Sequence, residues 1–229
     1  MGLSLEVGIL ADLATNDPEA VAGYEEYFAS VNELLAEARL APHREPNECE
    51  IWSADMFSYS GLHYLRRVAA HLDARGELPI PGGSKSSEDP VLEGHFDDFI
   101  GASPGLFRRL FASKESYSRR FDHLIVHSDA EGFYLPADFP KVLLGDDDDV
   151  PGGMVGSAPR LLGELDHLAS VLEVPPGLES QSDALWDAVE SQGEGDETWQ
   201  RYAIETFSCV TLREGCRRSI ATGAALVFC

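Results

Sequence analysis

The stretch that decides the fold class is FDHLIVHSDAEGFYL, residues 121–135. Residues 121–126 and 132–135 are short apolar runs of strand length, and the five residues between them are typical of a turn. The sequence therefore predicts an antiparallel hairpin near 121–135, in which Gly132 is available for a backbone position of positive φ. Together with the helices that flank it, this hairpin indicates the α+β class.

Helical periodicity is the main signal on both sides of the hairpin. Apolar residues recur every three or four positions in five segments, between capping residues and proline or glycine stops. The predicted helices are 18–39, 59–74, 103–113, one that opens at Ser157 and stops before Pro175, and 197–222. Short apolar runs at 3–10, 50–53 and 224–228 predict further strands. We therefore expect a helix-rich α+β fold with about five helices and a small sheet.

One domain is expected over residues 1–229, because 229 residues with 44% hydrophobic content suffice for one core. Residues 77–90 are rich in Pro, Gly and Ser and predict an exposed, flexible loop. No stretch approaches the roughly 18 consecutive apolar residues of a membrane span, and the first residues lack the features of a secretory signal. We therefore expect the protein in the cytoplasm.

Charge is the strongest compositional signal. Forty acidic residues face seventeen basic ones, the net charge is −23, and residues 161–200 contain ten acids and neither Lys nor Arg. Nucleic acids and acidic membranes bind proteins through Lys and Arg, so neither is an expected partner. We expect a basic protein partner instead. The candidate binding face consists of Glu179, Asp183, Asp187, Glu190, Glu194, Asp196 and Glu197.

The one concentration of basic residues offers an alternative to a foreign partner. It contains Arg108, Arg109, Arg119 and Arg120. These side chains have the charge needed to meet the acidic face of a second copy, so self-association is also consistent with the sequence. In this reading the acidity itself reflects only solubility or a salt-tolerant host.

The decisive stretch also contains metal-binding residue types. His123, His127, Asp129 and Glu131 lie within nine residues, and imidazole and carboxylate groups bind divalent metals or act as general bases. His95 or His63 would complete such a site from elsewhere in the chain. The same four residues equally suit a structural turn. Their spacing matches no H-E-x-x-H or H-x-H motif, and the four cysteines show no C-x-x-C spacing.

Two further motifs are explained more simply by structure. Residues 101–105 match the G-x-S-x-G nucleophile elbow, but Pro104 follows Ser103 and has no backbone N–H for an oxyanion hole. Ser103 is therefore predicted to cap a helix. The run Asp146–Asp149, before a glycine-rich stretch, lacks the Lys of a P-loop and the alternating ligands of a calcium loop. It predicts a solvated acidic loop that caps the next helix.

Several segments resemble one group of uncharacterised bacterial proteins. They are HSDAEGFYLP (127–136), PGGMVGSAPRLLGEL (151–165), RRSIATGAALVF (217–228) and LSLEVGILADLATNDPE (3–19). The resemblance spans most of the chain and implies no activity, cofactor or catalytic residue. The leading functional hypothesis is a non-enzymatic acidic interaction protein of immunity or antitoxin type, without a cofactor. The alternative is a metal-dependent hydrolase or metal-binding protein that uses a divalent metal at the 123–131 cluster.

Overall fold

A computed structural model of the chain describes residues 3–56, 58–82, 86–102 and 120–229. The elements are β1 (Ser4–Val7), α1 (Ile9–Asn16), α2 (Val21–Glu37), β2 (Trp52–Asp55), α3 (Ser58–Arg75), η1 (Ser86–Glu88), α4 (Pro90–Ala102), α5 (Asp122–Ile125), β3 (Gly132–Leu135), β4 (Leu143–Leu144), η2 (Pro151–Gly153), β5 (Met154–Ser157), α6 (Ala158–Val171), α7 (Asp183–Glu190), α8 (Thr198–Arg201), α9 (Ala203–Thr222) and β6 (Leu226–Phe228). The helix-rich α+β class is confirmed. The described residues form nine α-helices rather than about five, because periodicity does not reveal helices as short as α5 and α8.

Six strands form one mixed sheet in the order β2-β1-β6-β3-β5-β4. β3 and β5 are parallel, and every other neighbouring pair is antiparallel. β6, the last strand of the chain, lies between β1 and β3, and thus joins the N-terminal pair of strands to the other three.

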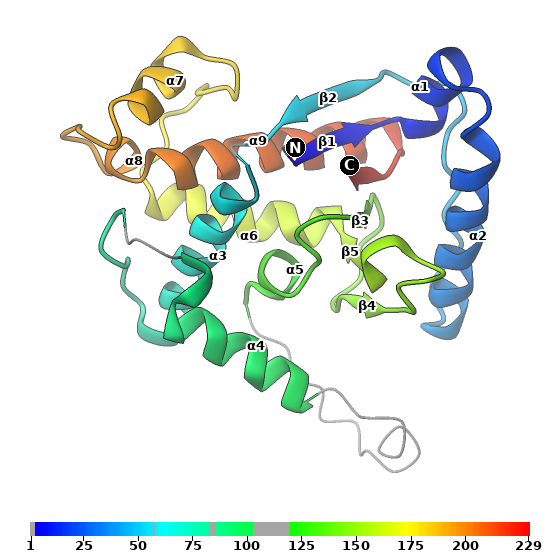
Figure 1. Cartoon of the computed structure of the whole chain (residues 1–229), viewed down its shortest axis with the longest axis horizontal. Coiled ribbons are helices and arrows are strands. Elements are labelled where there is room, and N and C mark those ends of the chain that lie inside the picture. Colours follow the sequence, from blue (N-terminus) through cyan, green and yellow to red (C-terminus); the bar gives the residue numbers. More distant parts are fainter. Residues whose placement is uncertain (1–2, 57, 83–85, 103–119) are drawn as a thin grey trace.

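Helices cover both faces of the sheet (Figure 1). Alternate strand residues point to opposite faces. Leu5, Tyr134 and Leu226 belong to the core shared with α3, α6 and α9. Phe133 and Val227 belong to a second core, which is shared with α1 and α2. A third, smaller apolar cluster attaches α7 and α8 to the first half of α9.

The predicted hairpin near 121–135 is wrong. Residues 132–135 do form a strand, but residues 122–125 form the single helical turn α5, and β3 pairs with β5 and β6. The reason lies in long-range contacts. The Glu164 carboxylate of α6 accepts the backbone N–H groups of His123 and Leu124 at 3.1 and 2.8 Å. Two side chains from distant helices, Glu164 of α6 and Arg66 of α3, thus hold this segment in a helical conformation that its own residues do not predict.

Arg66 of α3 holds the other end of the same turn. Its side chain is buried, and its guanidinium donates to the carbonyl oxygens of Leu124, His127 and Ser128 at 2.8, 2.5 and 3.1 Å. The last carbonyl groups of a helix have no partner within the helix, so Arg66 satisfies groups that would otherwise be buried without hydrogen bonds.

Hydrogen bonds attach the described part of the predicted loop at 77–90 to the rest of the protein, including one from Arg67 to the Ile80 carbonyl oxygen. The Tyr202 hydroxyl donates to the carbonyl oxygen of Pro79. At the other end, Asp89 accepts the N–H groups of Val91 and Leu92 and so caps α4, a helix that the periodicity did not reveal. Residues 83–85 lie outside the described residues. The flexibility of the loop and the single domain remain predictions.

The predicted helix at 197–222 is two helices, α8 and α9, separated at Tyr202 with φ −108° and ψ 44°. Glu197 and Gln200 form a capping box at the start of α8. Gly223 ends α9 in the left-handed conformation at φ 79°, as a helix-terminating glycine should.

Candidate functional site

The acidic face predicted from the sequence is exposed. Its seven carboxylate residues lie just before α7, on α7, or between α7 and α8: Glu179, Asp183, Asp187, Glu190, Glu194, Asp196 and Glu197. α7 and α8 project from one end of the long axis of the molecule (Figure 1). The residues therefore have the accessibility that a binding face requires, and their role in binding remains a prediction.

Part of this face already serves the local fold. Glu197 accepts the backbone N–H of Gln200 in the capping box and the indole N–H of Trp199. Just outside the face, the Glu173 carboxylate accepts the Thr198 hydroxyl at 2.5 Å. These carboxylates are engaged within the protein, so the number available to a partner is smaller than the sequence count suggests.

A second acidic surface, which was not predicted from the sequence, lies on α2. Glu26, Glu33 and Glu37 are exposed. They are spaced seven and four residues apart, so they share one side of the helix. Since each helical residue rises about 1.5 Å, the row is about 16 Å long. The opposite side of α2 carries Phe28 and Val31 into the core, which fixes the row against the body of the protein.

The aspartate run 146–149 lies beside this row. All four aspartates are exposed, and the loop is shaped by hydrogen bonds from the N–H groups of Asp149 and Val150 to the Asp146 carbonyl. Gly145 lets the loop approach α2, because a Cβ at this position would lie 2.8 Å from Leu34 Cδ1. Figure 1 shows the loop between β4 and β5 close to α2, at the end of the molecule opposite α7.

A shallow groove of about 300 Å³ separates the two acidic segments. Glu33 and Glu37 of α2 and Asp146 and Asp149 of the loop all line it, with Leu34, Leu144 and Val150 among the apolar residues. We call this surface the groove face. It comprises Glu26, Glu33, Glu37, Asp146, Asp147, Asp148 and Asp149.

Within the described part of the chain, none of these seven carboxylates forms an ion pair. Five arginines neutralise carboxylates elsewhere: Arg67 at Asp89, Arg160 at Asp138, Arg213 and Arg217 at Asp166, and Arg218 at Glu50 and Glu214. The groove-face carboxylates are therefore exposed and unpaired among the described residues, as are those of the α7 face, and the charges of both surfaces act on the surroundings.

A sequence signal for this surface exists. Residues 1–38 contain eight acids and neither Lys nor Arg, and no base occurs between Lys141 and Arg160. Each base-free segment is shorter than the one at 161–200, so neither stands out alone. Only the fold shows that α2 and the aspartate loop meet, because more than a hundred residues separate them in the chain. The aspartates lie in a solvated loop, as predicted, but Ser157 rather than an aspartate caps the next helix.

The four residues of the predicted metal cluster do not converge. The ring nitrogens of buried His127 face the carbonyl oxygens of Ser128 and Phe133, each at 3.1 Å, and Nδ1 of buried His123 accepts the N–H of Ser157. Asp129 pairs with His63 instead, at 2.9 Å, while Glu131 is exposed. Among the described residues no group of three or more His, Cys, Asp or Glu side chains is arranged to hold a metal ion.

The other histidines have separate partners. His71 lies 3.0 Å from Asp89, next to Arg67, and His95 lies 3.4 Å from Asp122. Two histidines were expected to complete the cluster. His63 contacts one of its four members, Asp129, and His95 contacts Asp122, which lies outside it. The imidazoles of His63 and His95 thus contact different carboxylates rather than sharing one site.

Burial of His127 leads to a test by pH. Desolvation lowers the pKa of His127 from 6.5 to about 4, so between these values the unfolded chain binds more protons and acid destabilises the fold. The variant His127→Gln lacks this titration. We expect the advantage of the native protein over His127→Gln in unfolding free energy to shrink by up to about 3 kcal/mol from pH 6.5 to pH 4. Urea denaturation across this range measures it, and a constant difference would contradict the expectation.

Two predicted features fall largely outside the described residues. Gly101 and Ala102 end α4, but the rest of the G-x-S-x-G motif and the helix expected at 103–113 lie in 103–119. Arg108, Arg109 and Arg119 of the basic cluster lie there too. Arg120 is described, and its guanidinium carbon lies 5.6 Å from the ring centroid of Phe121. In the described residues, no helix combines the length and the hydropathy needed to cross a membrane.

Comparison with known proteins decides between the functional interpretations. A protein-family model with the description "Putative DNA-mimic protein" matches residues 1–228. Neither the curated proteins nor the solved structures gave a match. The family description names DNA mimicry and neither an immunity protein, an antitoxin nor a hydrolase, so the immunity or antitoxin interpretation and the metal-dependent hydrolase are both wrong.

The partner expectations need the same correction. The family description names mimicry of DNA, which points to a partner protein that binds DNA. This finding replaces three expectations: a basic protein of unspecified kind, self-association through the arginine cluster, and no connection with nucleic acid. The expectation that one family accounts for most of the chain is confirmed, because the family model matches nearly every residue. This chain belongs to the DNA-mimic family.

Proposed function

We propose that the protein occupies the DNA-binding site of another protein and presents carboxylates where DNA presents phosphates. The observation that carries the proposal is the groove face, on which seven exposed carboxylates form no ion pair within the described residues. DNA-binding proteins hold the phosphate backbone with Lys and Arg side chains. The groove face offers such side chains the same kind of partner on a folded protein surface.

The arrangement of the groove face supports the proposal beyond its charge. Duplex DNA carries two phosphate rows with a groove between them. Here the α2 row and the aspartate loop flank a groove. The α2 row of about 16 Å corresponds to about five base pairs at roughly 3.4 Å each. A DNA-binding element that contacts a short duplex segment would therefore meet carboxylates on both sides.

The face on α7 is a second candidate for the same role. Its residues are exposed, and it lies at the opposite end of the molecule (Figure 1). Glu197 is engaged in capping α8, whereas the groove-face carboxylates flank their groove from two sides. We therefore assign the mimicry to the groove face and keep the α7 face as its matched comparison.

The proposal is tested by competition. The immobilised protein is used to capture proteins from a lysate of the source cells, and the captured proteins are eluted with a short DNA duplex and identified. Each is then purified and bound to labelled duplex in a mobility-shift assay. We expect the acidic protein to release the duplex in a concentration-dependent way, and its affinity for the partner to fall steeply as salt rises.

Two outcomes would overturn the proposal. In one, the captured proteins do not bind DNA. In the other, the partner binds the duplex and the acidic protein at the same time, so a ternary complex appears instead of free duplex. Serum albumin, an acidic protein without this surface, serves as the control for competition by charge alone.

A further inference from the structure

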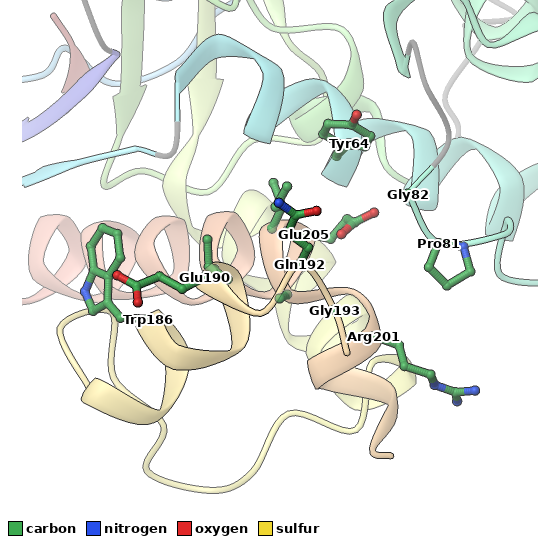
Figure 2. A pocket seen from close by; sticks show the side chains of 12 residues that line it. Tyr64, Pro81, Gly82, Trp186, Glu190, Gln192, Gly193, Arg201 and Glu205 are labelled. Atoms are coloured by element: carbon green, nitrogen blue, oxygen red, sulfur yellow. The ribbon is translucent and has the colours of Figure 1, made fainter. Parts of the chain in front are cut away.

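A cavity of about 840 Å³ lies between α3, α7 and α9 (Figure 2), and these elements lie away from the groove face (Figure 1). Residues of four helices (α3, α7, α8 and α9) and of the loop after α3 line it, and Tyr64 of α3 and Trp186 of α7 are among them. Its volume is typical of a site for a small organic molecule. The mimicry proposed above uses no residue of this cavity.

Glu205 of α9 supplies the most unusual group in the cavity. Its side chain is 4% exposed, and Oε1 accepts no hydrogen bond from any described residue. Desolvation raises the pKa of this carboxyl from 4.5 to about 7. A buried acceptor without a donor is costly, so a ligand that donates to Oε1 would gain binding free energy at this point.

The other walls suit an apolar body. Val189 of α7 and Ile204 of α9 line the cavity together with Trp186. Trp186 is 38% exposed, an unusual position for an indole, and it packs edge-on against Phe207 at a centroid distance of 4.8 Å. The ring is thereby held in place, and its remaining surface is available to a ligand.

The charges around the cavity favour a cation. Glu190 of α7 is exposed at the rim, and Glu205 lies inside. Arg201 also lines the cavity, but its guanidinium donates to the Thr198 hydroxyl at 3.3 Å, and Figure 2 shows it directed away from Glu205. The charge of Arg67 also acts on Glu205, but its guanidinium is paired with Asp89 at 2.9 Å. Glu190 and Glu205 therefore remain for a ligand of positive charge.

We infer that this cavity binds an organic cation, a protonated amine or guanidinium on an apolar stem, with the cationic group at Glu205 and the stem against Trp186. A free metabolite carries this chemistry, and so does a Lys or Arg side chain of a bound protein. The charge-assisted hydrogen bond to Glu205 provides recognition, and the indole provides apolar contact and a cation–π surface.

The test uses three probes with the same stem, hexylamine, hexanol and hexanoate, titrated into the whole protein and followed by amide and indole NMR shifts. We expect hexylamine to bind at least tenfold more tightly than hexanol, and hexanoate not to bind. Glu205→Gln should weaken hexylamine binding at least tenfold. Glu179→Gln, a matched change of an exposed residue outside the cavity, should leave the affinity unchanged.

A second arm separates the two sources of the cation. A capped Gly-Arg-Gly peptide that binds as tightly as hexylamine, with the same dependence on Glu205, would identify a protein side chain as the ligand. Binding of hexylamine alone would identify a free amine. Trp186→Ala provides a further variant if Glu205→Gln fails to fold. Equal binding of hexylamine and hexanol, or an unchanged affinity in a folded Glu205→Gln variant, would overturn the inference.

Discussion

Neutralising four groove-face carboxylates, in a Glu33→Gln, Glu37→Gln, Asp146→Asn and Asp149→Asn variant, is expected to weaken binding to the DNA-binding partner at least 100-fold at 0.1 M salt. Contacts between opposite charges across an interface are worth about 0.7–1.4 kcal/mol each when partly exposed, and tenfold in affinity corresponds to about 1.4 kcal/mol. Four such contacts thus give about 3–6 kcal/mol. Isothermal titration with the partner identified by DNA elution measures the loss.

The control variant removes the same number of charges from the α7 face. It carries Glu179→Gln, Asp183→Asn, Asp187→Asn and Glu190→Gln, and all four side chains are exposed. We expect it to bind within threefold of the native protein, because its net charge changes equally while the groove face is intact. If this variant loses the partner and the groove variant keeps it, the mimicry belongs to the α7 face. Equal losses would show that only net charge matters.

Replacement of Arg66 by Met is expected to have the largest effect on stability, lowering the free energy of unfolding by about 3–5 kcal/mol. The guanidinium donates to one carbonyl oxygen of α5 and to two of the residues that follow it, and Met fills similar space without a donor. The buried carbonyl groups would then lack partners. For a chain of this length the melting temperature should fall by roughly 10 °C.

Arg75→Met is the matched control, because Arg75 is exposed at the end of the same helix. It should change the unfolding free energy by less than about 0.5 kcal/mol. Chemical denaturation of both variants gives the comparison. A loss below 1 kcal/mol for Arg66→Met would show that water or backbone rearrangement replaces the guanidinium.

The long amphipathic helices were predictable because their residues carry the information locally. Ser157 and Pro159 at the start of α6, and glycine after α3 and α9, place these helices within a few residues of their observed ends, and Pro18 lies three residues before the start of α2. α5 was not predictable, since Glu164 and Arg66 are contributed by α6 and α3. The residues 121–126 alone have the composition of a strand.

The candidate site shows the same limit. Acidity was visible in the sequence, and the exposed α7 carboxylates follow from it. The groove face depends instead on the approach of the aspartate loop to Leu34, which no local pattern contains. His127 illustrates the opposite error: a residue type suited to metals is held between two backbone carbonyl groups, so its chemistry is used within the fold.

The position of β6 has a consequence for synthesis on the ribosome. Residues 226–228 are made after every other described strand, yet they lie between β1 and β3 and connect the two parts of the sheet. The pairing of β1 with β6 spans more than two hundred residues, and contacts of such sequence separation form slowly. A nascent chain therefore carries unpaired strand edges until translation of this segment is complete, and chaperones that shield such edges should influence its yield.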